Sequence, residues 1–144
     1  RYGVKRDLQF VTMIPDYEVS TKSAREVLPN NMSYAQAVYQ MGRCAALAKA
    51  MEIGNAMIMK RACTDQMQEP YRKDLIPEYA DVNKLCEDAG MITMYISGSG
   101  STMIALTQEE TDAGVLAETI KKRYPTWDVR ILKATYDGVQ SEVC

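Results

Sequence analysis

The chain has 144 residues, enough for one domain that buries a core without disulfide staples. Its 17 basic and 19 acidic side chains are interspersed, and the net charge of −2 argues against a nucleic-acid or membrane-surface protein. The sequence lacks histidine, and its four cysteines are widely spaced, so neither zinc-type spacing nor Cys/His catalysis is supported. We therefore expect a protein of the reducing cytoplasm, with Cys44, Cys63 and Cys86 as core or half-buried residues.

The first two predicted elements are a strand and a short helix. Residues 7–14 alternate in hydropathy and end at Pro15, which is typical of a strand. Ser20 or Thr21 then caps a short helix that ends before residues 29–31. Its apolar residues fall on one face: Ala24, Val27 and Leu28.

The longest predicted helix begins after Ser33, a strong N-cap, and stops at Gly54. Apolar residues recur in it at three- and four-residue steps, which predicts a face packed against a sheet or another helix. This apolar face consists of Tyr34, Ala37, Val38, Met41, Ala45, Ala48 and Met51.

Residues 55–64 predict a third helix, with Ala56, Met59 and Cys63 pointing inward. Residues 65–81 contain Pro70 and Pro77, so we expect an irregular connection with one helical turn at most. Residues 82–89 then form a helix that Gly90 stops.

A hairpin follows, with strands over residues 91–96 and 102–106 joined by the sequence SGSGST at 97–102. Two glycines permit positive φ and close approach of a ligand, while free N–H groups and hydroxyls offer hydrogen bonds. The loop is therefore a candidate ligand site. The alternative is a flexible hairpin loop without a ligand, since Gly and Ser dominate turns of every function.

An amphipathic helix begins at Thr111 or Asp112 and ends at Pro125, and residues 127–132 alternate as a strand. Residues 134–144 are polar and are expected to fray, with Cys144 on a loose end. The order of elements predicts an α+β fold over residues 1–144 as a single domain. This fold is a split βαβ (ferredoxin-like) sandwich, with a four-stranded antiparallel sheet and helices on one face.

Three features fall outside the predicted strands and core: the pair Thr21 and Arg25, Arg72, and the glycine loop at 97–102. Thr21 and Arg25 lie four residues apart and share a helix face, and Arg72 follows an aromatic residue in a segment where folding does not require an arginine. Two converging guanidiniums would clamp a carboxylate or a phosphate. The alternative for each arginine alone is a solvated surface residue.

Three stretches, TKSAREVLP (21–29), EPYR (69–72) and YISGSGST (95–102), together resemble three successive motifs of homoserine kinase, a member of the GHMP small-molecule kinases. Their order and spacing agree over nearly the whole chain. The resemblance implies a GHMP kinase C-terminal domain whose N-terminal ATP-binding domain is absent. Because the chain opens on Arg1 without an initiator methionine, we expect an excised piece. One departure is Ser101, where the family usually has proline, which is expected to loosen the loop.

The resemblance also implies roles for individual residues. Arg25 and Arg72 would hold the carboxylate of homoserine, Thr21 would hydrogen-bond near the reacting hydroxyl, and Gly98 would present backbone to the substrate. Four loop residues would lie beside the transferred phosphoryl group: Ser97, Ser99, Gly100 and Ser101. ATP and Mg²⁺ would be bound mainly by the N-terminal domain. Because the motifs lack histidine and an obvious aspartate base, this half would contribute positioning and charge stabilisation rather than proton abstraction.

The sequence thus predicts the substrate-binding half of an ATP-dependent kinase that makes O-phosphohomoserine in threonine biosynthesis and is inactive alone. Its partners would be homoserine and its own N-terminal domain, and a homodimer is the alternative association. Another GHMP kinase, for mevalonate, phosphomevalonate or diphosphocytidyl-methylerythritol, would share the glycine loop but not both arginines. The alternative from another class is a non-catalytic, amino-acid-binding ferredoxin-like regulatory module. A purely structural packing domain is the third alternative.

Overall fold

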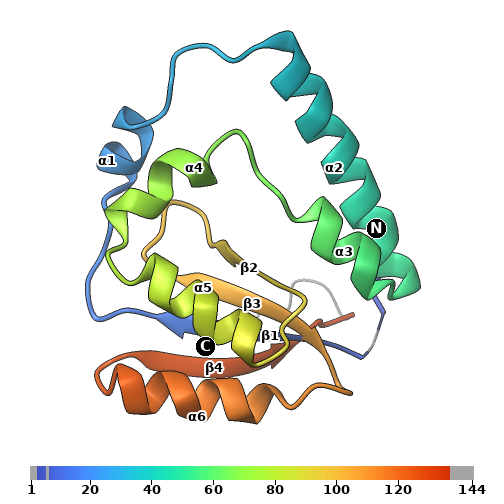
Figure 1. Cartoon of the computed structure of the whole chain (residues 1–144), viewed down its shortest axis with the longest axis vertical. Helices are drawn as coiled ribbons and strands as arrows, with labels where there is room; N and C mark the ends of the chain where they lie inside the picture. The colour runs from blue at the N-terminus through green and yellow to red at the C-terminus, as the bar shows by residue number, and fades with distance from the viewer. Residues whose placement is uncertain (1–2, 6, 137–144) are drawn as a thin grey trace, which may run out of the picture.

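A four-stranded antiparallel sheet organises the computed structural model, which describes residues 3–5 and 7–136 (Figure 1). The strands are β1 (Leu8–Ile14), β2 (Thr93–Ile96), β3 (Met103–Gln108) and β4 (Asp128–Lys133), in the order β2-β3-β1-β4. This order, with the hairpin β2–β3 at one edge, confirms the predicted split βαβ sandwich. The part of the predicted frayed tail from residue 137 onward, with Cys144, lies outside the described residues.

Helices α5 (Tyr79–Asp88) and α6 (Ala113–Arg123) cover one face of the sheet. Alternate residues of the central strands, such as Val11 and Met103, point into this layer and are 0% exposed. They pack against Leu116 and Ile120 of α6, which are also 0% exposed. The predicted layer of helices on one face is therefore confirmed, and it holds the larger part of the core.

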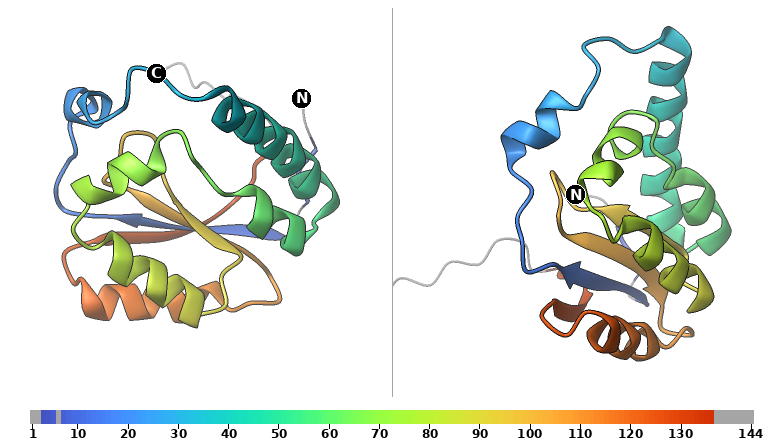
Figure 2. Two further views of the ribbon diagram at one scale, coloured as in Figure 1. Left: turned by 45° about the horizontal axis from the view of Figure 1, so that its top comes forward. Right: turned by 60° about the vertical axis from the view of Figure 1, so that its left-hand side comes forward.

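A second, partial layer covers the other face of the sheet. It consists of α2 (Tyr34–Ile53) and α3 (Ala56–Ala62), and Figure 2 shows the sheet between the two layers. The side chains of Leu8 and Leu106 point to this face of the sheet, away from α5 and α6. They pack against Ala50 and Met59. The prediction placed helices on one face only. The signal for two layers was that the strands carry apolar residues on both sides.

Three short helical segments connect these layers. Helix α1 (Thr21–Glu26) is capped by Ser20, one of the two predicted caps, and α4 (Glu69–Arg72) continues into the 3₁₀ turn η1 (Lys73–Leu75). The helical turn predicted in residues 65–81 is thus α4, and α5 begins at Tyr79 rather than at residue 82. Since α1 ends at Glu26, Val27 lies beyond it and is 36% exposed, contrary to its predicted burial.

Helix α2 begins where it was predicted, because Ser33 and Gln36 form a reciprocal capping box. Its predicted buried face is wrong over the first half of the helix, where Tyr34, Val38 and Met41 are 86%, 48% and 64% exposed. The physical reason is that alanines and other small residues occur on every side of this helix. The spacing of its larger residues therefore does not identify one inner side. Cys44 of α2 is likewise exposed, contrary to expectation.

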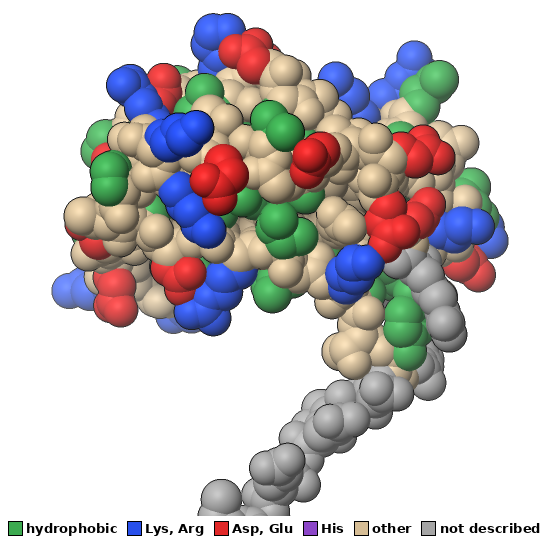
Figure 3. Space-filling view, turned by 90° about the horizontal axis from the view of Figure 1, so that it is seen from below, with side chains coloured by type: hydrophobic (Ala, Val, Ile, Leu, Met, Phe, Trp, Pro, Cys, Tyr) green, Lys and Arg blue, Asp and Glu red, His purple; other side chains and the backbone are tan. Residues whose placement is uncertain are grey.

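The outer surface on the α6 side carries basic and acidic side chains in close alternation, with apolar side chains scattered among them (Figure 3). The ion pair Arg123–Asp81 joins the C-terminal end of α6 to α5. Within the described residues, no helix combines the length and apolar character needed to cross a bilayer.

We expect the α6 layer to dominate stability. Replacing Leu116, which is 0% exposed, by Ala removes side-chain volume from a packed core and should lower the free energy of unfolding by about 2–5 kcal/mol. The matched control is Leu132→Ala on β4, which is 47% exposed and should cost less than about 1 kcal/mol. Urea denaturation measures both, and equal losses would contradict this layering.

Candidate functional site

The N-terminal end of α4 is fixed by one carboxylate. Asp65 accepts hydrogen bonds from the backbone N–H groups of Met67 at 2.6 Å and Glu69 at 2.9 Å, and also from that of Gln68. These amides begin a helical turn and would otherwise lack acceptors. Pro70 in the first turn supplies a preset φ, so a helix of four residues holds a defined orientation.

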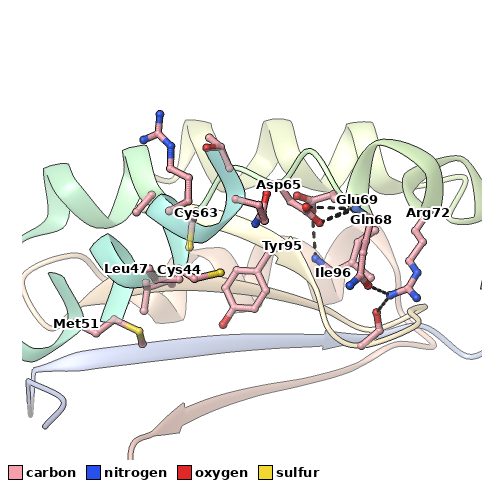
Figure 4. A pocket seen from close by; sticks show the side chains of 16 residues that line it. Cys44, Leu47, Met51, Cys63, Asp65, Gln68, Glu69, Arg72, Tyr95 and Ile96 are labelled. Carbon is pink, nitrogen blue, oxygen red and sulfur yellow. Dashed lines mark hydrogen bonds between the residues drawn. The ribbon is translucent and has the colours of Figure 1, made fainter. Parts of the chain in front are cut away.

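Arg72, the last residue of α4, joins three segments of the chain (Figure 4). Its Nε donates to the Ala24 carbonyl of α1 at 3.1 Å, and its Nη1 donates to the Gly98 carbonyl of the glycine loop at 2.8 Å. Nη1 also donates to the Gln68 side-chain oxygen. The expectation that folding does not require an arginine here is therefore wrong. None of these bonds uses Nη2, which stays available to a ligand.

Glu69 holds the entrance of the same loop. Its carboxylate accepts a hydrogen bond from the backbone N–H of Ile96 at 3.2 Å, at the point where β2 ends, and it also bonds the Tyr79 hydroxyl. Burial raises the pKa of Glu69 above its ordinary value, against the opposing effect of these two hydrogen bonds. Helix α4 thus positions the glycine loop at both its entrance and its tip.

The glycine loop, residues 97–102, is held by bonds of its own. Gly98 and Gly100 have φ values of +59° and +85°, which only glycine adopts readily. The Ser97 N–H donates to Thr102, and the Gly100 N–H donates to Ser97. The expectation of free N–H groups therefore holds only in part.

Ser101, the residue expected to loosen the loop, is 5% exposed, and its hydroxyl donates to the Tyr17 carbonyl at 2.5 Å. Proline has no such donor. This bond instead ties the loop to the segment between β1 and α1.

Two cavities flank the loop. The first, called the α2 cavity here, measures about 340 Å³ and lies between α2, α3, α4 and the sheet, with Arg72 and Gly98 on its lining (Figure 4). Most of the remaining lining is apolar: Cys44, Leu47, Met51, Cys63, Tyr95 and Leu106 among others. The second, the loop cavity, measures about 530 Å³ and includes Thr21 with Ser99, Gly100 and Ser101.

The three segments predicted to form the site therefore meet, but they divide between two cavities. Arg72 and Gly98 line the α2 cavity, whereas Thr21, Ser99, Gly100 and Ser101 line the loop cavity. Arg25 is exposed on α1 and directly follows Ala24, whose carbonyl binds Arg72. Ser97 begins the loop and bonds across it to Thr102. Their roles toward a substrate stay predictions.

Asp65, Gln68 and Glu69 were missed by the sequence analysis. Asp65 had a usable signal, because an aspartate shortly before a proline-containing turn is a common way to start a helix. Gln68 had none, because its role depends on the position of Arg72. Glu69 stands in the motif EPYR but was given no role, because its contact is with Ile96, 27 residues further along the chain.

Comparison with known proteins defines the class. Residues 37–126 match the family model for the C-terminal region of GHMP kinases, which is more than half of the chain. The chain therefore belongs to the GHMP kinase C-terminal family.

Within this class the chain is similar to homoserine kinases. It is 32% identical to the homoserine kinase of Clostridium botulinum over 140 residues, and 34% identical to that of Caldicellulosiruptor saccharolyticus over 142 residues. Each alignment covers 96% of this chain, but 47% and 46% of the respective relative. The chain thus spans about half the length of these curated relatives.

Solved structures agree with this placement. The crystal structure of homoserine kinase from Cytophaga hutchinsonii superposes with a TM-score of 0.83 at 31% identity, covering 94% of this chain and 44% of that one. Phosphomevalonate kinase from Streptococcus pneumoniae superposes with a TM-score of 0.69 at 12% identity, covering 93% of this chain and 42% of that one. The second likeness shows a shared fold alone.

The bond from Glu69 to the loop entrance gives a testable expectation. Glu69→Ala leaves the Ile96 N–H without its acceptor and should destabilise the protein by about 1–2 kcal/mol. Glu69→Gln keeps an acceptor oxygen and should stay within about 0.5 kcal/mol of the parent. Hydrogen exchange at the Ile96 amide should be faster in the Ala variant only, and unchanged exchange in both would contradict the contact.

The same carboxyl predicts a pH dependence. Because burial raises the folded-state pKa of Glu69 above its ordinary 4.5, the folded protein retains this proton to a higher pH than the unfolded chain. The stability contributed by the protonated carboxyl of Glu69 is fully present below the pKa of the unfolded state. It is lost as pH rises through the pKa of the folded state. The stability of the parent relative to Glu69→Gln, measured in urea titrations, should therefore fall as pH rises above the ordinary Glu pKa of 4.5. A constant or rising difference would contradict this sign.

Proposed function

We propose that the chain is the C-terminal, substrate-binding half of an ATP-dependent homoserine kinase of the cytoplasm. The complete enzyme would transfer the terminal phosphoryl group of ATP to the hydroxyl of homoserine, giving O-phosphohomoserine. The similarity to homoserine kinases over 96% of the chain supports this proposal. Its central observation is that three distant segments, 21–29, 69–72 and 95–102, meet at the Arg72 guanidinium.

The carboxylate of homoserine is the group that the arginines fit. Arg25 is exposed on α1 and follows Ala24, whose carbonyl accepts the bond from Arg72, and Arg72 would offer the two N–H groups of Nη2. Arg72 is already held by three acceptors, so it would meet the substrate in a fixed orientation. Thr21 would contact the substrate from the loop cavity, and Gly98 would approach it with backbone, since a Cβ there would meet nothing within 4 Å.

The phosphoryl group would lie beside the glycine loop, near Ser97, Ser99, Gly100 and Ser101. Within the described part of the chain, no group of three His, Cys, Asp or Glu side chains could hold a metal ion. The resemblance to the family implies that ATP and Mg²⁺ would be bound mainly by the N-terminal half of the complete polypeptide, and we derive no step through them. This half would supply orientation and positive charge, as phosphoryl transfer through a loose transition state requires.

Two observations favour this proposal over its alternatives. Family membership favours a kinase over a non-catalytic regulatory module or a purely structural domain. Among kinases, the identities of 31% and 34% to the homoserine kinases of Cytophaga hutchinsonii and Caldicellulosiruptor saccharolyticus exceed the 12% to phosphomevalonate kinase and the 17% to 4-(cytidine 5′-diphospho)-2C-methyl-D-erythritol kinase.

The two arginines are tested in the complete enzyme. Arg25→Ala and Arg72→Ala should each weaken homoserine binding by about 2–4 kcal/mol, because each removes a charged contact to the carboxylate. Steady-state kinetics with homoserine as the varied substrate measures this loss in KM and kcat/KM. Lys22→Ala, also on α1 and exposed, is the matched control and should leave both unchanged.

The variants also separate binding from folding. Arg25→Ala should leave the melting temperature unchanged, whereas Arg72→Ala should lower it as well, because three acceptors lose their donor. An unchanged KM for homoserine in both arginine variants would end the proposal.

A further inference from the structure

The loop cavity has two walls that come from distant parts of the chain. One wall is the segment that leads from β1 into α1 and ends at Thr21, and the other is the stretch 99–102 of the glycine loop. Of the hydrogen bonds made by the described residues, one joins the two walls directly, from the Ser101 hydroxyl to the Tyr17 carbonyl. The width of the cavity at this point therefore depends on where Tyr17 is held.

Tyr17 is held by its side chain. Its hydroxyl donates to the Glu78 carboxylate at 2.6 Å, across 61 residues of sequence. Glu78 immediately precedes α5, and its side chain makes no capping bond to that helix, so the carboxylate serves Tyr17 instead. Helix α5 is in turn fixed in the core by Val82, which is 0% exposed. One phenol thus connects a buried helix to a wall of the cavity.

The phenol of Tyr17 is suited to a lasting contact. Burial raises its pKa above the ordinary value of 10.0, and the hydrogen bond to the Glu78 carboxylate raises it further. The hydroxyl therefore keeps its proton at neutral pH and remains a donor. A hydrogen bond to a carboxylate is stronger than one between neutral groups, so this contact can fix the position of the Tyr17 backbone.

The segment around Glu78 also contacts the glycine loop at a second point. A Cβ at Gly100 would lie 3.1 Å from Cδ1 of Ile76, which is 2% exposed and lies two residues before Glu78. Gly100 therefore packs closely on Ile76, while Ser101, the next residue, bonds to Tyr17. Residues 76–78 thus support the loop directly at Gly100 and, through Tyr17, at Ser101.

We propose that Tyr17 is a positioning residue for phosphoryl transfer, which sets the distance between the glycine loop and the segment that carries Thr21. The inference rests on the proposed function, in which the reacting hydroxyl and the phosphoryl group lie at these two walls. Arg72 would hold the carboxylate and so contribute to binding. Tyr17 acts through the loop on the alignment of reacting atoms, so its loss should lower kcat rather than raise the KM for homoserine.

Steady-state kinetics of the complete enzyme test this division of roles. Tyr17→Phe keeps the ring and the backbone carbonyl but removes the donor to Glu78. It should lower kcat at least about fivefold, with the KM for homoserine within about twofold of the parent value. The matched control is Tyr39→Phe, which also loses a tyrosine hydrogen bond, of 2.7 Å to Thr64, and should leave kcat within about 1.5-fold.

Two further variants test the contacts on either side of Tyr17. Glu78→Gln keeps an acceptor oxygen for the phenol and should retain kcat within about twofold. Ser101→Ala removes the donor to the Tyr17 carbonyl and should lower kcat at an unchanged KM. Because both substitutions break one path, Ser101→Ala combined with Tyr17→Phe should lose less than about twofold more than the larger single loss. Multiplied losses, or a kcat of Tyr17→Phe within about twofold of the parent, would overturn the inference.

Hydrogen exchange gives a readout that requires no substrate. The Gly100 N–H donates to the Ser97 carbonyl at 3.0 Å inside the loop. Its exchange should be at least about fivefold faster in Tyr17→Phe and unchanged in Tyr39→Phe, and equal rates in the two variants would overturn the inference.

Failure of the proposed function gives a different result from failure of this inference. If the complete parent does not phosphorylate homoserine, the proposed function is wrong, and the Gly100 exchange rate still decides whether Tyr17 holds the loop. If the parent is active and Tyr17→Phe keeps its kcat, this inference alone is wrong.

Discussion

The Arg72 guanidinium is the contact on which the arrangement of this domain's site depends. Three segments far apart in sequence are connected through its hydrogen bonds to Ala24, Gln68 and Gly98. Each of these bonds is charge-assisted and therefore stronger than a neutral one. Because α4 is one turn long, Arg72 can be this firmly placed only if the start of α4 is fixed as well, which Asp65 does with consecutive backbone amides. Under the proposed function, substrate binding and local folding would therefore share one side chain.

The glycine loop is likewise held in place by a few specific hydrogen bonds. It is restrained at its entrance by Glu69, at its tip by Arg72 and on its far side by the bond from Ser101 to Tyr17. Positive φ at Gly98 leaves its surface open, while the loop around it cannot move freely. A loop that orients a substrate, rather than transferring a proton, must have its final conformation before the substrate binds. Reorganising the loop afterwards would raise the activation barrier of the reaction. The restraints on this loop satisfy that condition within one chain.

Most of the secondary structure could be predicted from the sequence, but the contacts of the site could not. Boundaries with strong local chemistry were predictable: Ser33 and Asp112 begin their helices, and the two-residue alternation marks β1 and β4. The inner face of α2 was not, because an alanine-rich helix has no clear apolar side. The motifs located Arg72 and the loop, whereas the structural use of Arg72 depends on a carbonyl 48 residues away, which no local pattern encodes.

The two layers of this fold differ in how far one chain can stabilise them. Around α6, Leu116 and Ile120 are fully buried against the sheet, so this layer is complete in itself. The α2 layer is incomplete, with a cavity inside and exposed apolar residues outside. Arg72 and Gly98 line the cavity of this incomplete layer, so the residues proposed to bind substrate lie where packing within the chain is weakest.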